Sequence, residues 1–173
     1  MTIGLANLIT LSRLVIIPFL IYTIQHDYYI ISGALVLFAV FTDWLDGIVA
    51  RQMNDVTQHG KLLDPAVDKI FTISILAAFI EKHYISTYPL FLIVTREMLV
   101  TWLRSVMVNR GIVVSAGFYG KLKTTLQMVS IFLFAINLWL AGYIILWLSI
   151  IVAYISAVPY FKQFYKEKAW ISN

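Results

Sequence analysis

Long apolar stretches alternate with short polar ones along the whole chain. A helix needs about 20 mostly apolar residues to cross the hydrocarbon core of a bilayer. By this criterion the pattern predicts six membrane-spanning helices, at about residues 7–25, 29–51, 61–81, 87–108, 119–139 and 143–165. Short connections join them, and we expect the last one at Leu140–Tyr143. The prediction is one helical domain over residues 1–173, with a short N-terminal segment at the membrane interface.

The composition supports a membrane protein. Of the 173 residues 61% are hydrophobic and 13% are charged, and the mean hydropathy is +0.84. Soluble domains of this length rarely show such a balance. The chain has no cysteine, which excludes disulfides. Its net charge of +4 indicates loop topology and contact with anionic headgroups, so we do not expect nucleic acid as a partner.

The distribution of lysine and arginine predicts the orientation. With the N-terminus in the cytoplasm, six spans place residues 52–60, residues 109–118 and the C-terminal tail on the cytoplasmic side, where most basic residues fall. The opposite turns keep Lys82 beside Asp27 and Glu81. Both termini are therefore expected in the cytoplasm. The ionisable residues gather at the cytoplasmic ends of the helices, and the nearly charge-free outer half argues against a through-pore.

Four of the aspartates in the stretch DWLDGIVARQMNDVTQHGKLLDPAVDK have helical spacing: Asp43, Asp46, Asp64 and Asp68. The first two are three residues apart and the last two are four apart, so each pair lies on one face of its helix. Because the two helices are joined by a short loop, all four carboxylates can meet across the hairpin. Gly47 and Ala50 continue the first stripe and leave space beside the backbone. Pro65 suits the first turn of the second helix.

Four ionised carboxylates at this spacing would repel one another by several kcal/mol. Protons or cations must compensate them, because isolated charges at membrane depth are costly. Oxygen ligands without cysteine favour Mg²⁺ or Mn²⁺, as a pair of ions bridged by shared carboxylates. Such a pair suits phosphoryl chemistry. The alternative is that the aspartates are helix caps and partners for Arg51, Lys61 and Lys69.

The stretch also matches a signature, D-x2-D-G-x2-A-R-x8-G-x3-D-x3-D, at Asp43, Asp46, Gly47, Ala50, Arg51, Gly60, Asp64 and Asp68. It resembles the CDP-alcohol phosphotransferase family, which consists of integral membrane enzymes of phospholipid synthesis. The resemblance implies six transmembrane helices, a short N-terminal interfacial helix and a homodimer. It also implies a multi-pass protein of the bacterial cell membrane with its active site toward the cytoplasm.

The resemblance assigns roles to individual residues. Asp43, Asp46 and Asp64 would hold two metal ions, and Asp68 would contact one of them and act as the general base. The CDP part of the donor, CDP-diacylglycerol, would be contacted by Gly47, Arg51 and Thr57, with Asn7 near the nucleotide and Ala50 lining the same strip.

Basic residues further along the chain bear on the acceptor. Arg96 and Arg104 lie on one predicted helix, and Lys121, Lys123 and Thr124 lie near the start of the next, where free N–H groups favour an anion. We expect these groups to converge near the aspartates and to bind the phosphate of an acceptor such as glycerol 3-phosphate. Two alternatives remain: structural pairing of Arg96 and Arg104 with Glu97, and ordinary cytoplasmic charge bias for the two lysines.

Three further segments narrow the resemblance. NLITLSRLVIIP, REMLVTWLR and GKLKTTLQM are similar to segments of the bacterial phosphatidylglycerophosphate synthases of that family. Ala6 and Thr95 stand where proline and alanine are expected. These departures leave room for another acceptor with the same donor, either phosphatidylglycerol or inositol phosphate. A more remote alternative is a cation transporter that uses the acidic cluster as its ion site.

Overall fold

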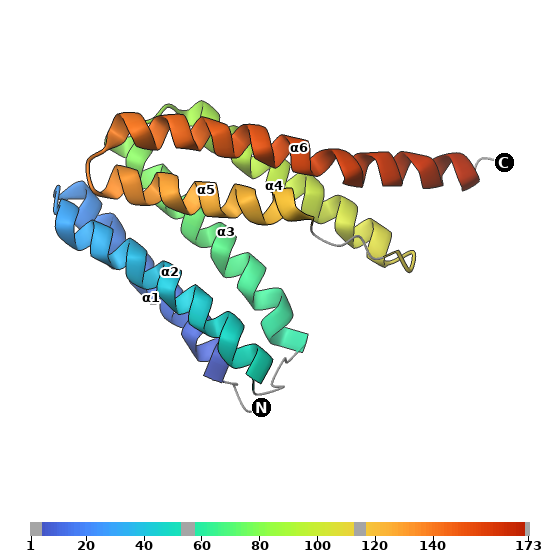
Figure 1. Cartoon of the computed structure of the whole chain (residues 1–173), viewed down its shortest axis with the longest axis horizontal. Coiled ribbons are helices and arrows are strands. Elements are labelled where there is room, and N and C mark those ends of the chain that lie inside the picture. The colour runs from blue at the N-terminus through green and yellow to red at the C-terminus, as the bar shows by residue number, and fades with distance from the viewer. Residues whose placement is uncertain (1–4, 53–57, 113–116, 172–173) are drawn as a thin grey trace. The chain divides into compact units, whose positions relative to one another are not determined.

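A computed structural model describes the backbone of residues 5–52, 58–112 and 117–171, and the side chains of residues 11–43, 45, 65–112 and 117–166. Within these ranges the chain is helical, without strands. The helices are α1 (Leu5–Gln25), α2 (Tyr29–Gln52), α3 (Gln58–Glu81), α4 (Thr87–Val108), α5 (Phe118–Ala135) and α6 (Trp139–Ile171). The predicted number and order of helices are confirmed for this part of the chain (Figure 1).

The helices form two compact units. Unit 1 comprises Met1–Ile85 and Met128–Tyr143, and unit 2 comprises Ser86–Gln127 and Ile144–Asn173. Unit 1 therefore contains α1, α2 and α3 with the end of α5 and the start of α6. Unit 2 contains α4 with the remaining parts of α5 and α6. A single domain over the whole chain stays a prediction.

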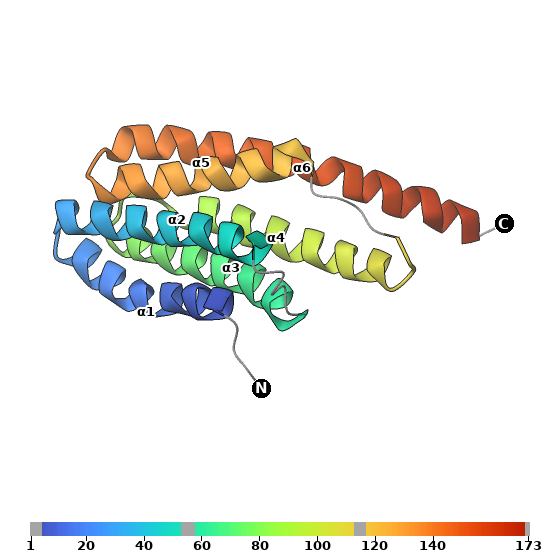
Figure 2. The ribbon, with the colours of Figure 1, turned by 60° about the horizontal axis from the view of Figure 1, so that its bottom comes forward.

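In unit 1, α1 packs against both α2 and α3. Figure 2 shows α1 and α2 as neighbours joined by a short turn. The buried hydrophobic residues in the described part of α1 are Ile17, Leu20 and Ile24, whose spacing of three and four places them on one face. Phe79 of α3 packs on Phe134 of α5, with ring centroids 5.1 Å apart. In a bilayer such tight packing, more than exclusion of water, selects which side chains lie inside.

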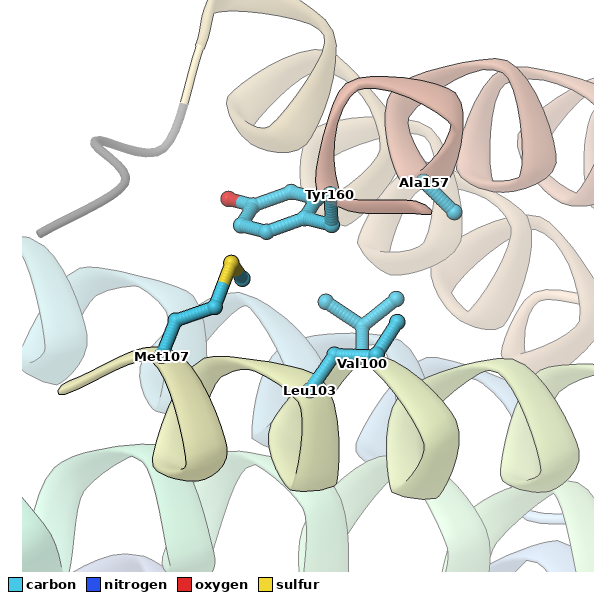
Figure 3. Packing of buried hydrophobic residues seen from close by; sticks show 5 residues of the cluster. All are labelled: Val100, Leu103, Met107, Ala157 and Tyr160. Atoms are coloured by element: carbon cyan, nitrogen blue, oxygen red, sulfur yellow. The ribbon is translucent and has the colours of Figure 1, made fainter. Parts of the chain in front are cut away.

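Unit 2 has its own apolar cluster, shown in Figure 3. Val100, Leu103 and Met107 project from one face of α4 toward Ala157 and Tyr160 of α6. All five are buried. The spacing of three and four residues along α4 again produces a single contact stripe.

The outward surface is strongly apolar. Large hydrophobic side chains point away from both cores, for example Phe19, Ile30 and Phe91. The architecture is that expected of a helical membrane protein. Among the described residues, however, only Trp139–Lys166 is both long and apolar enough to cross a membrane by length and composition, and Leu11–Gln25 and Tyr29–Asp43 are shorter apolar helices.

The connection before α6 differs from the prediction. We expected it at Leu140–Tyr143, but α5 ends at Ala135 and α6 begins at Trp139. Asn137 makes the turn with a φ of 65°, a conformation that asparagine tolerates better than most residues. Gly142 lies inside α6, where a Cβ would come within 3.0 Å of the Phe134 ring. The glycine therefore permits close helix packing and does not mark the turn.

Three helix boundaries also differ. The third helix begins at Gln58, so Pro65 lies inside α3 and not in its first turn. The sixth helix continues to Ile171, beyond the expected end near residue 165. The first helix is continuous from Leu5. A separate N-terminal interfacial helix is not seen in the described residues, which begin at that leucine.

In unit 1, polar contacts join the turn after α1 to the turn after α3, and these two turns form what we call the far end of the unit. Asp27 follows α1 with a φ of 60°, and Lys82 follows α3. Lys82 Nζ lies 2.7 Å from Asp27 Oδ1, and Gln25 Nε2 donates to Glu81 Oε2 at 2.7 Å. The hydrogen bond from Lys82 lowers the pKa of the Asp27 carboxyl below its usual value.

Candidate active site

Three helices of unit 1 meet at one guanidinium group. Arg13 of α1 is only 3% exposed, and its Nη1 lies 2.8 Å from Oδ1 of Asp43 on α2. The same nitrogen forms an ion pair and a hydrogen bond with Oδ1 of Asp68 on α3. The side chains of Asp43 and Asp68 are 57% and 36% exposed. A buried cation thus joins two carboxylates that remain open to a ligand.

This contact brings together two of the four predicted aspartates. Asp46 and Asp64 lie within α2 and α3, so the spacing of three and four residues falls on helices as predicted. Their side chains are outside the described residues, as are those of Asn7, Gly47, Ala50 and Arg51, and Thr57 is outside altogether. A single site made of all four carboxylates stays a prediction.

Arg13 is the residue of this site that sequence reasoning missed. It stands in an otherwise apolar segment, and the sequence pattern alone assigns it no role. A lone ionisable residue in such a segment is costly unless it is paired, and it therefore predicts a nearby partner. That signal was available, because carboxylates were already expected on the two following helices.

The donor atoms in unit 1 suit a divalent cation. Carboxylate oxygens are the ligands that Mg²⁺ and Mn²⁺ prefer. Asp43 and Asp68 reach one positively charged nitrogen from two different helices, so their carboxylates already share a cation. Among the side chains that the structure describes, no group of three or more potential metal ligands is present. The two described aspartates therefore fit part of a metal site.

A second charged network lies in unit 2, around Arg96 of α4. This side chain is buried, and three of its nitrogens have partners. Nε donates to the Ala153 carbonyl at 3.0 Å and Nη2 to Ser156 Oγ at 2.7 Å, both on α6. Nη1 donates to Glu97 Oε1 at 2.7 Å. Arg96 therefore ties α4 to α6.

Glu97 joins Arg96 to the lysine of the next helix. Its Oε1 atom also accepts a hydrogen bond from Lys123 of α5. The structural pair between Arg96 and Glu97, one of the alternatives open from the sequence, is present. Binding of a phosphate by Arg96 stays a prediction.

The remaining basic residues of unit 2 are more accessible. Arg104 is exposed, its Nη2 donates to Tyr160 Oη at 2.9 Å, and its Cζ lies 5.5 Å from the centroid of that ring. Lys121 is exposed in the first turn of α5. Thr124 Oγ1 donates to the Gly120 carbonyl at 3.2 Å. Of these side chains, Lys121 offers a cationic donor near the start of α5, where an anion is favoured, whereas Arg104 lies near the end of α4.

The comparison with known proteins decides the family. The sequence profile described as CDP-alcohol phosphatidyltransferase matches residues 3–155. The chain belongs to this family. The matched stretch runs through both units and includes Arg13, the aspartate stretch and the basic residues of α4 and α5. Members of the CDP-alcohol phosphatidyltransferase family generally depend on a divalent metal ion.

Individual relatives are similar along almost the whole chain. A protein of Wigglesworthia glossinidia brevipalpis is 33% identical, over 96% of this chain and 93% of its own length. One of Rickettsia bellii is 34% identical, over 92% and 94%, and one of Salmonella choleraesuis is 31% identical, over 92% and 94%. All three are named CDP-diacylglycerol–glycerol-3-phosphate 3-phosphatidyltransferase.

Proposed function

We propose that the chain transfers the phosphatidyl group of CDP-diacylglycerol to sn-glycerol 3-phosphate, giving phosphatidylglycerophosphate and CMP. One observation carries this proposal: relatives that cover more than nine-tenths of the chain share the name of that activity. The similarity extends over the residues of both charged networks, so donor and acceptor residues are inferred together.

The aspartates of α2 and α3 are proposed to bind the metal and the donor. Asp43, Asp46, Asp64 and Asp68 would hold two ions, Mg²⁺ or Mn²⁺, which neutralise charge on the donor diphosphate. The nucleotide would be contacted by Asn7, Gly47, Ala50, Arg51 and Thr57. Support comes from the partly exposed carboxylates of Asp43 and Asp68, which converge from two helices.

Asp68 is proposed as the general base. Its carboxylate accepts the proton of the primary hydroxyl of glycerol 3-phosphate, and the oxygen then bonds to the β-phosphorus of the donor. The bond from that phosphorus to the CMP oxygen breaks, and CMP leaves with the electron pair. The partial exposure of Asp68 supports this role, because a base must reach its substrate.

The basic residues of α4 and α5 are proposed to bind the acceptor phosphate. Arg104, Lys121, Lys123 and Thr124 would contact it, and Arg96 would complete the set. The described contacts favour a supporting role for Arg96, because it already holds Glu97 and α6. In this network two cationic side chains, Arg96 and Lys123, gather around one carboxylate, and this clustering of cations supports an anion site nearby.

We further propose that the chain is a homodimer with six membrane-spanning helices and an N-terminal interfacial segment. Both termini and the active site would face the cytoplasm of a bacterial cell. The large apolar side chains on the helix surfaces support contact with lipid. The acyl chains of the donor would remain in the bilayer while the headgroup reacts at its cytoplasmic face.

An acceptor panel tests the proposed reaction. Purified protein in detergent receives CDP-diacylglycerol and Mn²⁺, with glycerol 3-phosphate, phosphatidylglycerol, inositol phosphate or no acceptor, and CMP release is measured. We expect release that requires glycerol 3-phosphate and stops with a chelator. Release with a different acceptor would replace the proposed substrate. A complete lack of release with every acceptor would favour the transporter alternative.

A further inference from the structure

Arg13 has a role that the proposed reaction leaves unexplained. We propose that this arginine is the built-in counter-cation of the aspartate site: it holds Asp43 and Asp68 together and weakens the binding of the divalent metal. The inference rests on the proposed function in one respect, namely that these aspartates bind the metal. It concerns the contacts of Arg13 with two acidic side chains on two other helices.

The burial of Arg13 makes the pairing strong. A guanidinium that is almost fully buried must be compensated by opposite charge, because an unpaired charge there costs far more than one at a surface. Both partners come from other helices, so the contact links α1 to α2 and α3. Loss of the guanidinium would leave the two carboxylates close together without the cation that now lies between them and offsets their repulsion.

Exposure differs between the two kinds of charge. Arg13 lies within the protein, whereas the carboxylates of Asp43 and Asp68 are partly open. A cation that arrives from outside therefore meets the carboxylates first and does not need to pass Arg13. The arginine and the metal can thus act on the same two side chains at the same time.

A fixed positive charge at this place has two opposing effects on the site. It relieves the repulsion between the carboxylates, which stabilises the protein before metal binds. It also repels a divalent cation over a few ångströms, which lowers the metal affinity. A residue that only oriented the ligands would raise the metal affinity, and a purely structural residue would leave it unchanged. The direction of the change in affinity therefore distinguishes the three roles.

The test compares wild type with Arg13→Gln and Arg13→Lys, as full-length protein in lipid nanodiscs. Free Mn²⁺ is measured by electron paramagnetic resonance, and the melting temperature is measured with EDTA and with saturating Mn²⁺. For Arg13→Gln we expect a Kd for Mn²⁺ about tenfold lower. In EDTA we expect its melting temperature to fall by about 5 °C or more. The increase in melting temperature on adding Mn²⁺ should be larger for Arg13→Gln than for wild type, because tighter binding stabilises the folded state more.

Two further variants keep the test decisive. Arg13→Lys retains the charge and should bind Mn²⁺ within about threefold of wild type, which can be measured even if Arg13→Gln does not fold. Lys82→Gln is the control: it removes the cation of the Lys82–Asp27 ion pair in the same unit. It should leave the Kd for Mn²⁺ unchanged, since its partner is not one of the metal-binding aspartates.

Several results would overturn the inference. An unchanged Kd in Arg13→Gln would make the arginine purely structural, and a higher Kd would make it only an orienting residue. Tenfold tighter binding by Arg13→Lys would show that charge is not the cause. If wild type bound no Mn²⁺ at all, the metal site of the proposed function would fail, and the inference would fall with it.

Discussion

Among the side chains that the structure describes, unit 1 and unit 2 each bury one arginine, and the two arginines have different neighbours. Arg13 contacts two partly exposed carboxylates on two other helices. Arg96 contacts one carboxylate, a backbone carbonyl and a serine hydroxyl. A buried guanidinium therefore contacts two carboxylates in unit 1, whereas in unit 2 a buried guanidinium joins two helices through polar contacts.

The difference determines which ligand each network favours. In unit 1, the described contacts bring two carboxylates, those of Asp43 and Asp68, to the one guanidinium of Arg13. In unit 2, the described contacts bring two cationic side chains, Arg96 and Lys123, to the one carboxylate of Glu97. The first arrangement favours a cation and the second an anion. The proposed reaction, between a metal-bound diphosphate and a phosphorylated acceptor, would use both.

The largest effect is expected from the acidic network. Asp68→Asn removes the proposed base while keeping the size of the side chain, so kcat should fall about 1,000-fold. CDP-diacylglycerol binding should be largely retained, and it can be measured by titration of the lipid in nanodiscs. Asp27→Asn, at the far end of unit 1, is the matched control and should keep its activity. Activity near that of wild type in Asp68→Asn would remove this residue from the mechanism.

The next effect concerns the stability of unit 2. Arg96→Met leaves Glu97 with one cation fewer and removes the donors to Ala153 and Ser156. We expect a loss of about 3 kcal/mol in the free energy of unfolding, because one partner of a buried pair is gone. Arg104→Met, which loses a part-buried hydrogen bond to Tyr160, should cost about 1 kcal/mol. Denaturant-induced unfolding of the protein in mild detergent measures the free energy of unfolding of both variants. Equal losses would contradict the contrast between the two arginines.

A smaller effect is expected on the binding of the acceptor. Arg104→Ala should raise the KM for glycerol 3-phosphate about tenfold, through loss of one charge-assisted hydrogen bond, and should change the KM for the donor little. Tyr160→Phe removes the hydroxyl that accepts from Arg104, so it should act in the same direction but more weakly. Steady-state kinetics with each substrate varied in turn gives both values. Equal increases for donor and acceptor would count against an acceptor site at Arg104.

The smallest effect concerns the exposed pair at the far end of unit 1. The pKa of Asp27 is lowered in the folded protein, chiefly by its hydrogen bond with Lys82. A lowered folded pKa contributes stability above the unfolded value of 3.8, and this contribution is lost as the pH falls through the folded pKa. Lys82→Met should therefore lower the melting temperature at pH 6 and have less effect at pH 3. A larger effect at the acid pH would contradict this assignment.

The helices could be predicted from the sequence, because each is a long apolar stretch bounded by polar residues. The last turn could not, since Gly142 suggests a turn until the ring of Phe134 is seen against it. The helical spacing of Asp43 with Asp46 and of Asp64 with Asp68 predicted that the two helices carry one site. The bridge between them was missed because Arg13 lies 55 residues from Asp68, and only the packing of α1 brings them together. The tie from Arg96 to α6 was missed for the same reason.

Transfer of label from the acceptor to lipid tests the central claim most directly. Purified protein is given CDP-diacylglycerol, Mn²⁺ and radiolabelled glycerol 3-phosphate, and the lipid phase is extracted and analysed by mass spectrometry. The account predicts labelled phosphatidylglycerophosphate in wild type, and almost none with EDTA or in Asp68→Asn. Labelled lipid that forms equally well in EDTA, or no labelled lipid from wild type, would contradict it.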